Sequence, residues 1–263
     1  MAAPLHSGFG GSVKRAIDDV VGCGAAGHRL RKGMAQTAPD PADLDRVANA
    51  ALTRVADGMV LGLGTGRAAE AFIRRLGERA RRGMAVAGIP TSKRSEELAR
   101  RENIRVVTLD EVDHIDIAFD GADEVTPELY LTKGLGGALL RERVVAYEAE
   151  QFVVLVTPEK LVEKLGTRAP IPVEIVPYAA PTIKRHLEKL GGVVTQRQKE
   201  GNLGPFMTDN QNWIFDVKME PIDDPGLFDV KVRAIPGVVD TGIFLGLADV
   251  VLVGEAGSVR TLK

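Results

Sequence analysis

The sequence is poor in the residues that build disulfides and metal sites. It has one cysteine, Cys23, among 263 residues, so no disulfide can form within the chain. A lone thiol suits a reducing compartment, and we therefore expect a cytoplasmic protein. The four histidines, His6, His28, His114 and His186, include no pair at metal-ligand spacing. A histidine-based metal site is therefore not expected.

Long apolar runs and a surplus of one charge are missing as well. No apolar stretch approaches the roughly 20 residues that cross a bilayer, which argues against a membrane protein. Lysine and arginine number 34 against 36 acidic residues, a formal net charge of −2. The chain thus lacks the basic excess that attracts nucleic acid or anionic membranes. Its length fits one large domain or two small ones.

Residues 1–40 differ from the rest of the chain. They are rich in glycine and alanine, show weak apolar periodicity and contain no secretory apolar segment. The paired acids Asp18 and Asp19 and the scarcity of serine argue against a transit peptide. We expect a disordered N-terminal tail, or a start codon assigned too early with Met34 as the working start. The tail's basic residues before that methionine are Lys14, Arg15, Arg29, Arg31 and Lys32.

Helical and strand patterns alternate through the next part of the chain. This alternation predicts a Rossmann-like α/β domain, a parallel sheet covered on both faces, made of residues 41–168 plus 246–263. Apolar spacing places helices at 43–56, 68–81, 95–102 and 137–150, and strands at 59–63, 84–89, 105–107, 115–119 and 152–156. A last apolar strand at 248–253 is expected to return to this sheet.

The pattern changes between residues 169 and 245. Strands are expected at 172–176, 193–196, 213–217 and 238–244, and helices at 181–190 and 227–234. The resulting order β-α-β-β-α-β is that of a smaller ferredoxin-like domain.

One glutamate in the predicted helix 137–150 has an unusual position. On a helical wheel, Glu142 falls in the middle of an apolar sector that includes Leu139 and Val145, whereas Arg141 and Arg143 fall outside it. A carboxylate facing an apolar surface loses hydration, which raises its pKa and makes it a stronger base. The alternative is a solvated surface glutamate between two arginines, as most helical glutamates are.

A glycine turn, residues 62–66, follows the first strand and opens a helix. Such a turn presents backbone N–H groups and the positive helix end to a phosphate. It also fits a loose dinucleotide pattern, but the segment 89–93 lacks the carboxylate that would bind the ribose hydroxyls. Judged by itself, the turn could equally serve tight packing alone.

Acids and cations gather after later strands. Asp116, Asp120, Asp123 and Glu124 could bind a hard metal ion or sugar hydroxyls, or form a solvated loop. Asp120 ends a strand, where ligands of open α/β sheets usually bind. Lys133 precedes three glycines at 134, 136 and 137, although it could be an ordinary surface lysine. Lys160 follows the strand 152–156 and, taken alone, would be a structural residue.

Together these segments resemble ribose-5-phosphate isomerase of the A type. The resemblance rests on residues 62–66, 120–124, 133–142, 165–166 with 171–177, 208–210 and 235–239, in that order, and runs from about residue 43 to residue 263. It implies an aldose–ketose isomerase without cofactor or metal, usually a homodimer or tetramer, acting on a small phosphorylated sugar.

The resemblance also implies roles for single residues. Glu142 matches the proton-transferring glutamate, Lys133 the lysine beside the reacting carbons, and Asp120 and Asp123 the acids that hold substrate hydroxyls. The implied substrate-binding residues are Thr65, Gly66, Arg67, Ala68, Gly121, Ala122, Gly134, Leu135, Gly136 and Lys160.

The chain departs from the family pattern at two places. Arg67 and Ala68 stand where Ser-Thr is common, and Leu135 stands where glycine is usual. Two hydroxyl donors are lost, and the Arg67 guanidinium could grip phosphate in their place.

Two other functions remain open from the sequence. One is a non-catalytic sugar-phosphate sensor on the same scaffold. A sensor would need an attached domain that binds DNA or a partner, and the basic tail is too short and its charges too sparse for that role. The other is a nicotinamide-dependent oxidoreductase, which the missing ribose-binding acid disfavours.

Overall fold

A computed structural model describes residues 40–263, and the expectations for the N-terminal tail lie outside this range. A seven-stranded sheet has the order β14-β13-β7-β4-β1-β2-β3, in which all neighbours are parallel except the hairpin β13–β14. The strands are β1 (Val60–Leu63), β2 (Ala87–Pro90), β3 (Arg105–Val106), β4 (Ile115–Gly121), β7 (Ala149–Val156), β13 (Val250–Glu255) and β14 (Ser258–Leu262).

Both faces of this sheet are covered, which explains why its central strands are apolar without interruption. In β7, Val153 and Leu155 pack with the helices α2 (Pro41–Leu52), α3 (Arg67–Ala80) and α4 (Lys93–Arg101). Phe152, Val154 and Val156 point to the other face, where α5 (Leu139–Glu148) lies.

The second sheet is antiparallel and has the order β11-β8-β10-β9. Its elements are β8 (Ile171–Ile175), α6 (Ala180–Lys189), β9 (Val193–Gln196), β10 (Trp213–Lys218), α7 (Pro225–Arg233) and β11 (Val238–Thr241). This is the predicted β-α-β-β-α-β order, and the two helices enclose a separate apolar core. The predicted fold class is therefore confirmed.

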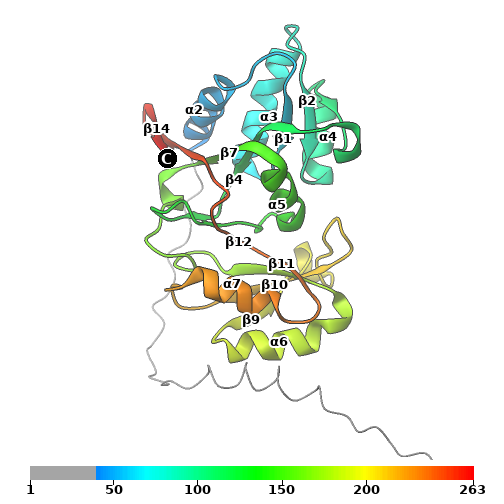
Figure 1. Cartoon of the computed structure of the whole chain (residues 1–263), viewed down its shortest axis with the longest axis vertical. Coiled ribbons are helices and arrows are strands. Elements are labelled where there is room, and N and C mark those ends of the chain that lie inside the picture. The colour runs from blue at the N-terminus through cyan, green and yellow to red at the C-terminus, as the bar shows by residue number, and fades with distance from the viewer. Residues whose placement is uncertain (1–39) are drawn as a thin grey trace, which may run out of the picture. The chain divides into compact units, whose positions relative to one another are not determined.

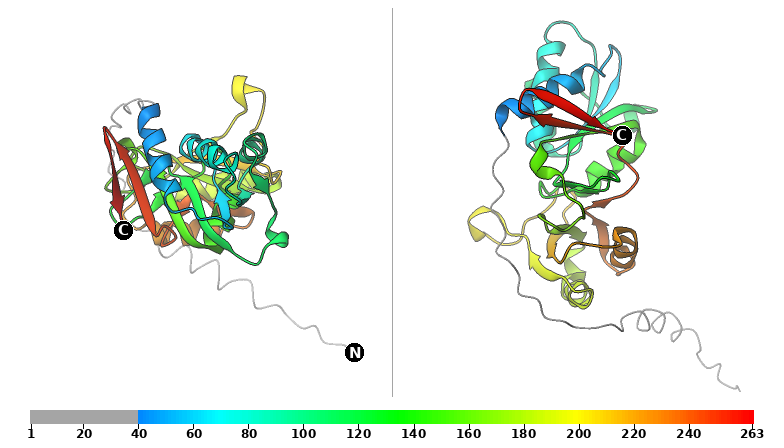
Figure 2. Two further views of the ribbon diagram at one scale, coloured as in Figure 1. Left: turned by 90° about the horizontal axis from the view of Figure 1, so that it is seen from above. Right: turned by 90° about the vertical axis from the view of Figure 1, so that its left-hand side faces the viewer.

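A small sheet joins the two cores, as Figure 1 shows around β12. It consists of β5 (Glu124–Val125), β6 (Leu131–Thr132) and β12 (Ile243–Phe244). Within β12, Ile243 packs in the core of the second sheet and Phe244 in the core of the first. The chain then returns to the first sheet through β13 and β14, the terminal strands coloured red in Figure 2.

Several predicted elements need correction. The strand expected at 238–244 is two strands, because the chain turns at Gly242 from β8 to β6. A Cβ on Gly242 would come within 2.3 Å of the Lys133 carbonyl oxygen. The helix expected to run to residue 150 ends at Glu148, since β7 begins at Ala149. The strands β5, β6 and β14 were not predicted.

Candidate active site

A cleft of about 260 Å³ opens where the strands β1, β4 and β7 end. Parallel strands place their carboxyl ends at one edge, which is the usual ligand site of such sheets. The cleft is lined by every residue proposed from the sequence except Asp120, which lies beneath it: Thr65, Gly66, Arg67, Ala68, Gly121, Ala122, Asp123, Lys133, Gly134, Leu135, Gly136, Glu142 and Lys160.

Lys133 and Glu142 form the buried centre of the cleft. The Lys133 ammonium lies 2.9 Å from Asp120 Oδ2 and 3.2 Å from Glu142 Oε2, and it donates to the Gly121 carbonyl oxygen at 2.7 Å. The side chains of Lys133 and Glu142 are 2% and 3% exposed. Within residues 40–263, Glu142 Oε2 is buried and accepts no hydrogen bond of good geometry. The Glu142 carboxylate, which borders the cleft, is thus held by its ion pair with Lys133 rather than by a hydrogen-bond network.

Burial controls the ionisation of this group. Desolvation raises the pKa of Glu142 to about 8, helped by the nearby Asp120 and Asp123 and opposed by Lys133. Burial alone would lower the pKa of Lys133, but the carboxylates of Asp120 and Glu142 more than offset it and raise the pKa above its usual value. An ammonium that stays charged beside a carboxylate with a raised pKa suits proton transfer near neutral pH.

Asp120 is fixed from three sides at the end of β4. Its Oδ1 accepts from the backbone N–H groups of Thr65 and Gly121, while Oδ2 accepts from Lys133. Gly64 makes this arrangement possible, because a Cβ there would lie 2.1 Å from Asp120 Oδ1. Desolvation nevertheless raises the pKa of Asp120.

Asp123 and the loop after Lys133 both line the cleft and contact each other directly. Asp123 Oδ2 accepts from the Leu135 backbone N–H at 3.0 Å. Gly134 and Gly137 have φ of 99° and 84°, the left-handed region that favours glycine. Burial raises the pKa of Asp123, whereas Lys133, Lys160 and Arg197 act in the opposite direction.

The glycine turn leads into the first turn of α3 at the other end of the cleft. Gly66 caps this helix at φ 107° without a side-chain hydrogen bond, so the positive helix end faces the cleft. The Thr65 hydroxyl is already bonded to those of Thr91 and Ser92, each at 2.8 Å. Its backbone N–H is bonded to Asp120. The hydroxyl and the backbone N–H of Thr65 are therefore engaged within the protein, and Thr65 supports the shape of this end of the cleft rather than offering free donors to a ligand.

Two cations stand at this end of the cleft. Arg67 is exposed, and Arg94 lies on α4 with its guanidinium 2.6 Å from Glu70 Oε1. Sequence reasoning missed Arg94. The signal that could have found it is its place just after β2, since residues that follow parallel strands share one sheet edge.

Two of the four clustered acids, Asp116 and Glu124, lie away from both the cleft and the Lys133 ammonium. Asp116 accepts from the Val60 backbone N–H at the start of β1. Glu124 is fully buried and accepts from the Thr132 hydroxyl and from the backbone N–H groups of residues 166, 168 and 169. Both acids therefore hold the fold, and only Asp120 and Asp123 reach the site.

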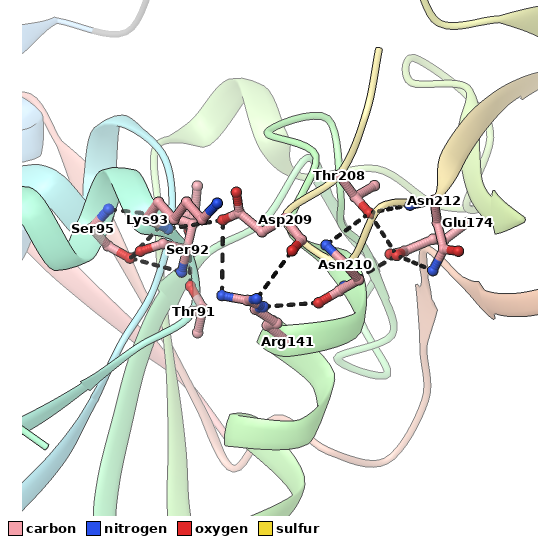
Figure 3. Close-up of polar contacts among 11 residues, drawn as sticks. Thr91, Ser92, Lys93, Ser95, Arg141, Glu174, Thr208, Asp209, Asn210 and Asn212 are labelled. Atoms are coloured by element: carbon pink, nitrogen blue, oxygen red, sulfur yellow. Dashed lines mark hydrogen bonds and ion pairs between the residues drawn. The ribbon is translucent and has the colours of Figure 1, made fainter. Parts of the chain in front are cut away.

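The second sheet also contacts this region, through the segment 208–212. Buried Glu174 on β8 accepts from the side chains of Thr208, Asn210 and Asn212. The segment in turn binds Arg141 of α5, while Asp209 accepts from the Lys93 backbone N–H at the start of α4 (Figure 3). This network ties α4 and α5 to the smaller domain.

No cluster of three or more metal-ligating side chains occurs among residues 40–263. No helix in the same range is long and apolar enough to cross a bilayer. A buried carboxylate with a raised pKa, a fixed ammonium and an anion-attracting helix end on an open α/β sheet are the features of an enzyme that moves protons on a small anionic substrate.

Comparison with known proteins identifies the particular family. The model of the family described as Ribose 5-phosphate isomerase A (phosphoriboisomerase A) matches residues 87–258. Ribose-5-phosphate isomerase A of Trichodesmium erythraeum is 46% identical over 235 residues, covering 86% of this chain and 99% of the relative. The Methanocaldococcus jannaschii relative is 50% identical over 220 residues, covering 83% and 96%.

Solved structures agree. Ribose 5-phosphate isomerase A from Methanocaldococcus jannaschii superposes with a TM-score of 0.81 at 48% identity, covering 85% of this chain and all of that one. A D-ribose-5-phosphate isomerase in complex with phospho-erythronic acid gives a TM-score of 0.82 at 41% identity, covering 84% and 98%. The chain belongs to the ribose 5-phosphate isomerase A family.

Proposed function

We propose that this protein interconverts D-ribose 5-phosphate and D-ribulose 5-phosphate, an aldose–ketose isomerisation. One observation carries the proposal: Glu142 Oε2 is buried in the cleft, 3.2 Å from the Lys133 ammonium, and accepts no hydrogen bond within the described chain. A base for abstracting a proton beside a carbonyl needs this combination of raised pKa and a neighbouring cation.

In the proposed reaction, Glu142 removes the proton from C2 of the open-chain aldose. The electrons of the C2–H bond form the C1–C2 double bond of an enediolate, and the negative charge develops on O1. The proton on O2 passes to O1, with Asp120 or Asp123 as the relay, while Glu142 returns its proton to C1. Lys133 and the backbone N–H groups of residues 134 and 136 stabilise the charged oxygen.

The phosphate is proposed to lie at the N-terminal end of α3. The N–H groups of Gly66, Arg67 and Ala68 attract an anion there, and the guanidinium groups of Arg67 and Arg94 add opposite charge. Lys160 stands on the short turn η2 (Pro158–Lys160) that borders the cleft. Binding energy from this remote group positions the reacting carbons.

A relative's ligand supports the same chemistry. Phospho-erythronic acid, bound to the related isomerase, has a phosphate at one end and a planar carboxylate at the other. A carboxylate imitates the planar, charged enediolate, so a site that binds it is suited to that intermediate. In this chain, Lys133 and the 134–136 loop would face the carboxylate.

We further propose that the enzyme works without a cofactor or metal, since the Lys133 ammonium supplies the positive charge, and as a homodimer or homotetramer in the cytoplasm. Nucleic acid and membranes are not proposed as partners.

The test is a coupled assay on ribose 5-phosphate with protein exhaustively treated with chelator and without added nucleotide. We expect full turnover. Activity that vanishes with chelator and returns with a divalent ion would overturn the metal-free mechanism. Binding of ribose 5-phosphate without any turnover would instead indicate a sugar-phosphate sensor.

A further inference from the structure

Arg197, a residue of the smaller domain, reaches the active-site loop. It follows β9 and is 13% exposed, and its Nε donates to Asp216 Oδ2 on β10 at 2.9 Å while Nη2 pairs with Asp216 Oδ1. The remaining nitrogen, Nη1, donates to the carbonyl oxygens of Gly134 and Leu135 at 2.8 and 3.1 Å. One guanidinium thus joins a strand of the second sheet to two successive peptide groups of the cleft.

The planarity of the peptide bond gives these contacts a consequence. In a trans peptide the C=O and the following N–H point in opposite directions. Fixing the Gly134 carbonyl therefore aims the Leu135 N–H away from Arg197, and this N–H meets Asp123 Oδ2 at 3.0 Å. Fixing the Leu135 carbonyl likewise turns the Gly136 N–H away from Arg197, and Gly136 lines the cleft.

A second contact with this loop comes from the hairpin that β9 and β10 form. The Phe206 ring packs against Gly137 so closely that a Cβ there would lie 2.5 Å from Phe206 Cζ. The Arg197 guanidinium stands 5.9 Å from the centre of that ring. The hairpin therefore contacts the loop at residues 134, 135 and 137, on both sides of Gly136.

We propose that Arg197 is a positioning residue for the isomerisation, which orients the amides of residues 135 and 136 toward Asp123 and the oxygen that becomes charged. Leu135 replaces the usual glycine, and the residue is 36% exposed. Because Arg197 holds the loop through its carbonyl groups, the role does not depend on the side chain at position 135. The inference rests on the proposed function.

The test compares Arg197→Met, Arg197→Lys and Asp216→Asn with the wild type. Methionine keeps the length of the side chain without donors, lysine keeps the charge without the fork, and Asp216→Asn releases Arg197 from its anchor. For each variant we measure kcat and KM for ribose 5-phosphate, the inhibition constant of phospho-erythronic acid, and Tm.

Arg141→Gln is the matched control. Arg141 also joins the two sheets, donating to Asn210 Oδ1 at 2.9 Å and to the Asp209 carbonyl oxygen, but it donates no hydrogen bond to residues 134–136. We expect this variant to lower Tm while leaving kcat and inhibition by phospho-erythronic acid unchanged.

For Arg197→Met we expect kcat to fall about tenfold and phospho-erythronic acid to bind about tenfold more weakly, with KM changed by less than about threefold. Arg197→Lys should recover only part of this loss, and Asp216→Asn should shift both quantities in the same direction. The inference fails if kcat and inhibitor binding stay within about twofold of wild type in Arg197→Met, or, should that variant not fold, in Asp216→Asn. Equal losses in Arg141→Gln would also overturn it. An inactive wild type would refute the proposed function instead.

Discussion

At the scale of single residues, the centre of the site has fewer positive charges than carboxylates. Lys133 shares its ammonium among Asp120, Glu142 and Asp123, so the charge cannot fully neutralise all three. The group left under-compensated is Glu142, whose Oε2 lacks a hydrogen bond within residues 40–263. The Glu142 side chain that is proposed to carry out the proton transfer is therefore also the one that lowers the stability of the folded state.

Glu142→Gln should reduce turnover by about 10²–10⁴-fold, because the amide keeps the shape but cannot accept the C2 proton. Steady-state kinetics on ribose 5-phosphate give the change in kcat, and calorimetry checks that the substrate still binds. Glu148→Gln, on the exposed side of the same helix, is the control. Near-normal turnover in Glu142→Gln would assign the base to Asp120 or Asp123.

As Glu142 ionises with rising pH, the activity of the enzyme should increase while the stability of the fold should decrease. Only the charged form is a base, so kcat/KM should rise with pH up to about 8, the raised pKa. The folded state holds this proton more tightly than the unfolded chain. Its contribution to stability is therefore full below the unfolded pKa of 4.5 and is lost as pH rises through about 8.

Glu142→Gln removes that titration. Its Tm relative to wild type should therefore increase between pH 5 and pH 9, as measured by thermal melts across this range. A Tm difference that is flat with pH would show that the folded pKa of Glu142 is not raised.

Arg67→Ala should raise KM for ribose 5-phosphate about tenfold or more, because the charge pairing proposed for the phosphate is lost. Residual turnover of unphosphorylated ribose should barely change, since that sugar offers no anion to bind. Arg101→Ala, an exposed arginine at the end of α4, serves as control. Equal losses on both sugars would indicate misfolding, and no loss on either would make Arg67 a surface residue.

Residue-level prediction from sequence succeeds where a local pattern exists. Glu142 is conspicuous because helical spacing places it among apolar neighbours, and it is indeed buried. Glu124 and Arg197 carry no such pattern, since the backbone groups that they bind lie more than 40 residues away along the chain. Nothing local to either residue indicates which peptide groups it will meet.

At the scale of secondary structure, tertiary contacts decide the details that periodicity leaves open. The segment 238–244 resembles one strand, but Gly242 lies so close to Lys133 and Pro172 that the chain changes sheets there. The strand β14 escaped prediction because it forms an exposed edge without regular apolar alternation. The short strands β5 and β6 pair for only two residues each.

Gly64→Ala tests how closely the turn after β1 is fitted to β4. The added methyl group overlaps Asp120, so that carboxylate must move away from Lys133. We expect the free energy of unfolding to fall by about 1–3 kcal/mol and kcat to fall as well. Urea denaturation measures the stability, and steady-state kinetics on ribose 5-phosphate measure kcat.

Gly226→Ala is the control for Gly64→Ala, since a Cβ at Gly226 would meet only Asp224 Oδ1 and Leu245, at 3.5 Å and beyond. Wild-type kcat in Gly64→Ala would mean that the placement of Asp120 is not critical.

At the scale of the whole described chain, ionic contacts unite the two cores. Asp240, on β11, is fully buried and binds Arg143 of α5 and Arg233 of α7. Arg143 also donates to the carbonyl oxygens of Thr241 and Ile243, beside the strand that serves both cores. The two sheets should therefore unfold together.

Calorimetry of the wild type should show one transition. Asp240→Asn leaves the Arg143 guanidinium without its counter-charge and Arg233 with Asp229 alone, and should lower the free energy of unfolding by about 3–5 kcal/mol, with the smaller domain melting first. Arg260→Gln, which breaks an exposed pair on the β13–β14 hairpin, should change stability by less than about 1 kcal/mol. Two separate transitions already in the wild type would contradict this coupling.

The position of β13 has a consequence for synthesis on the ribosome. This strand pairs with β7, yet the chain from 157 to 249, including the whole second sheet, is translated between them. Until residues 250–255 emerge, the apolar β7 presents an open edge to any other extended segment nearby. The nascent chain therefore depends on residues 250–255 for protection against aggregation, and premature termination before them would release a species that is prone to aggregate.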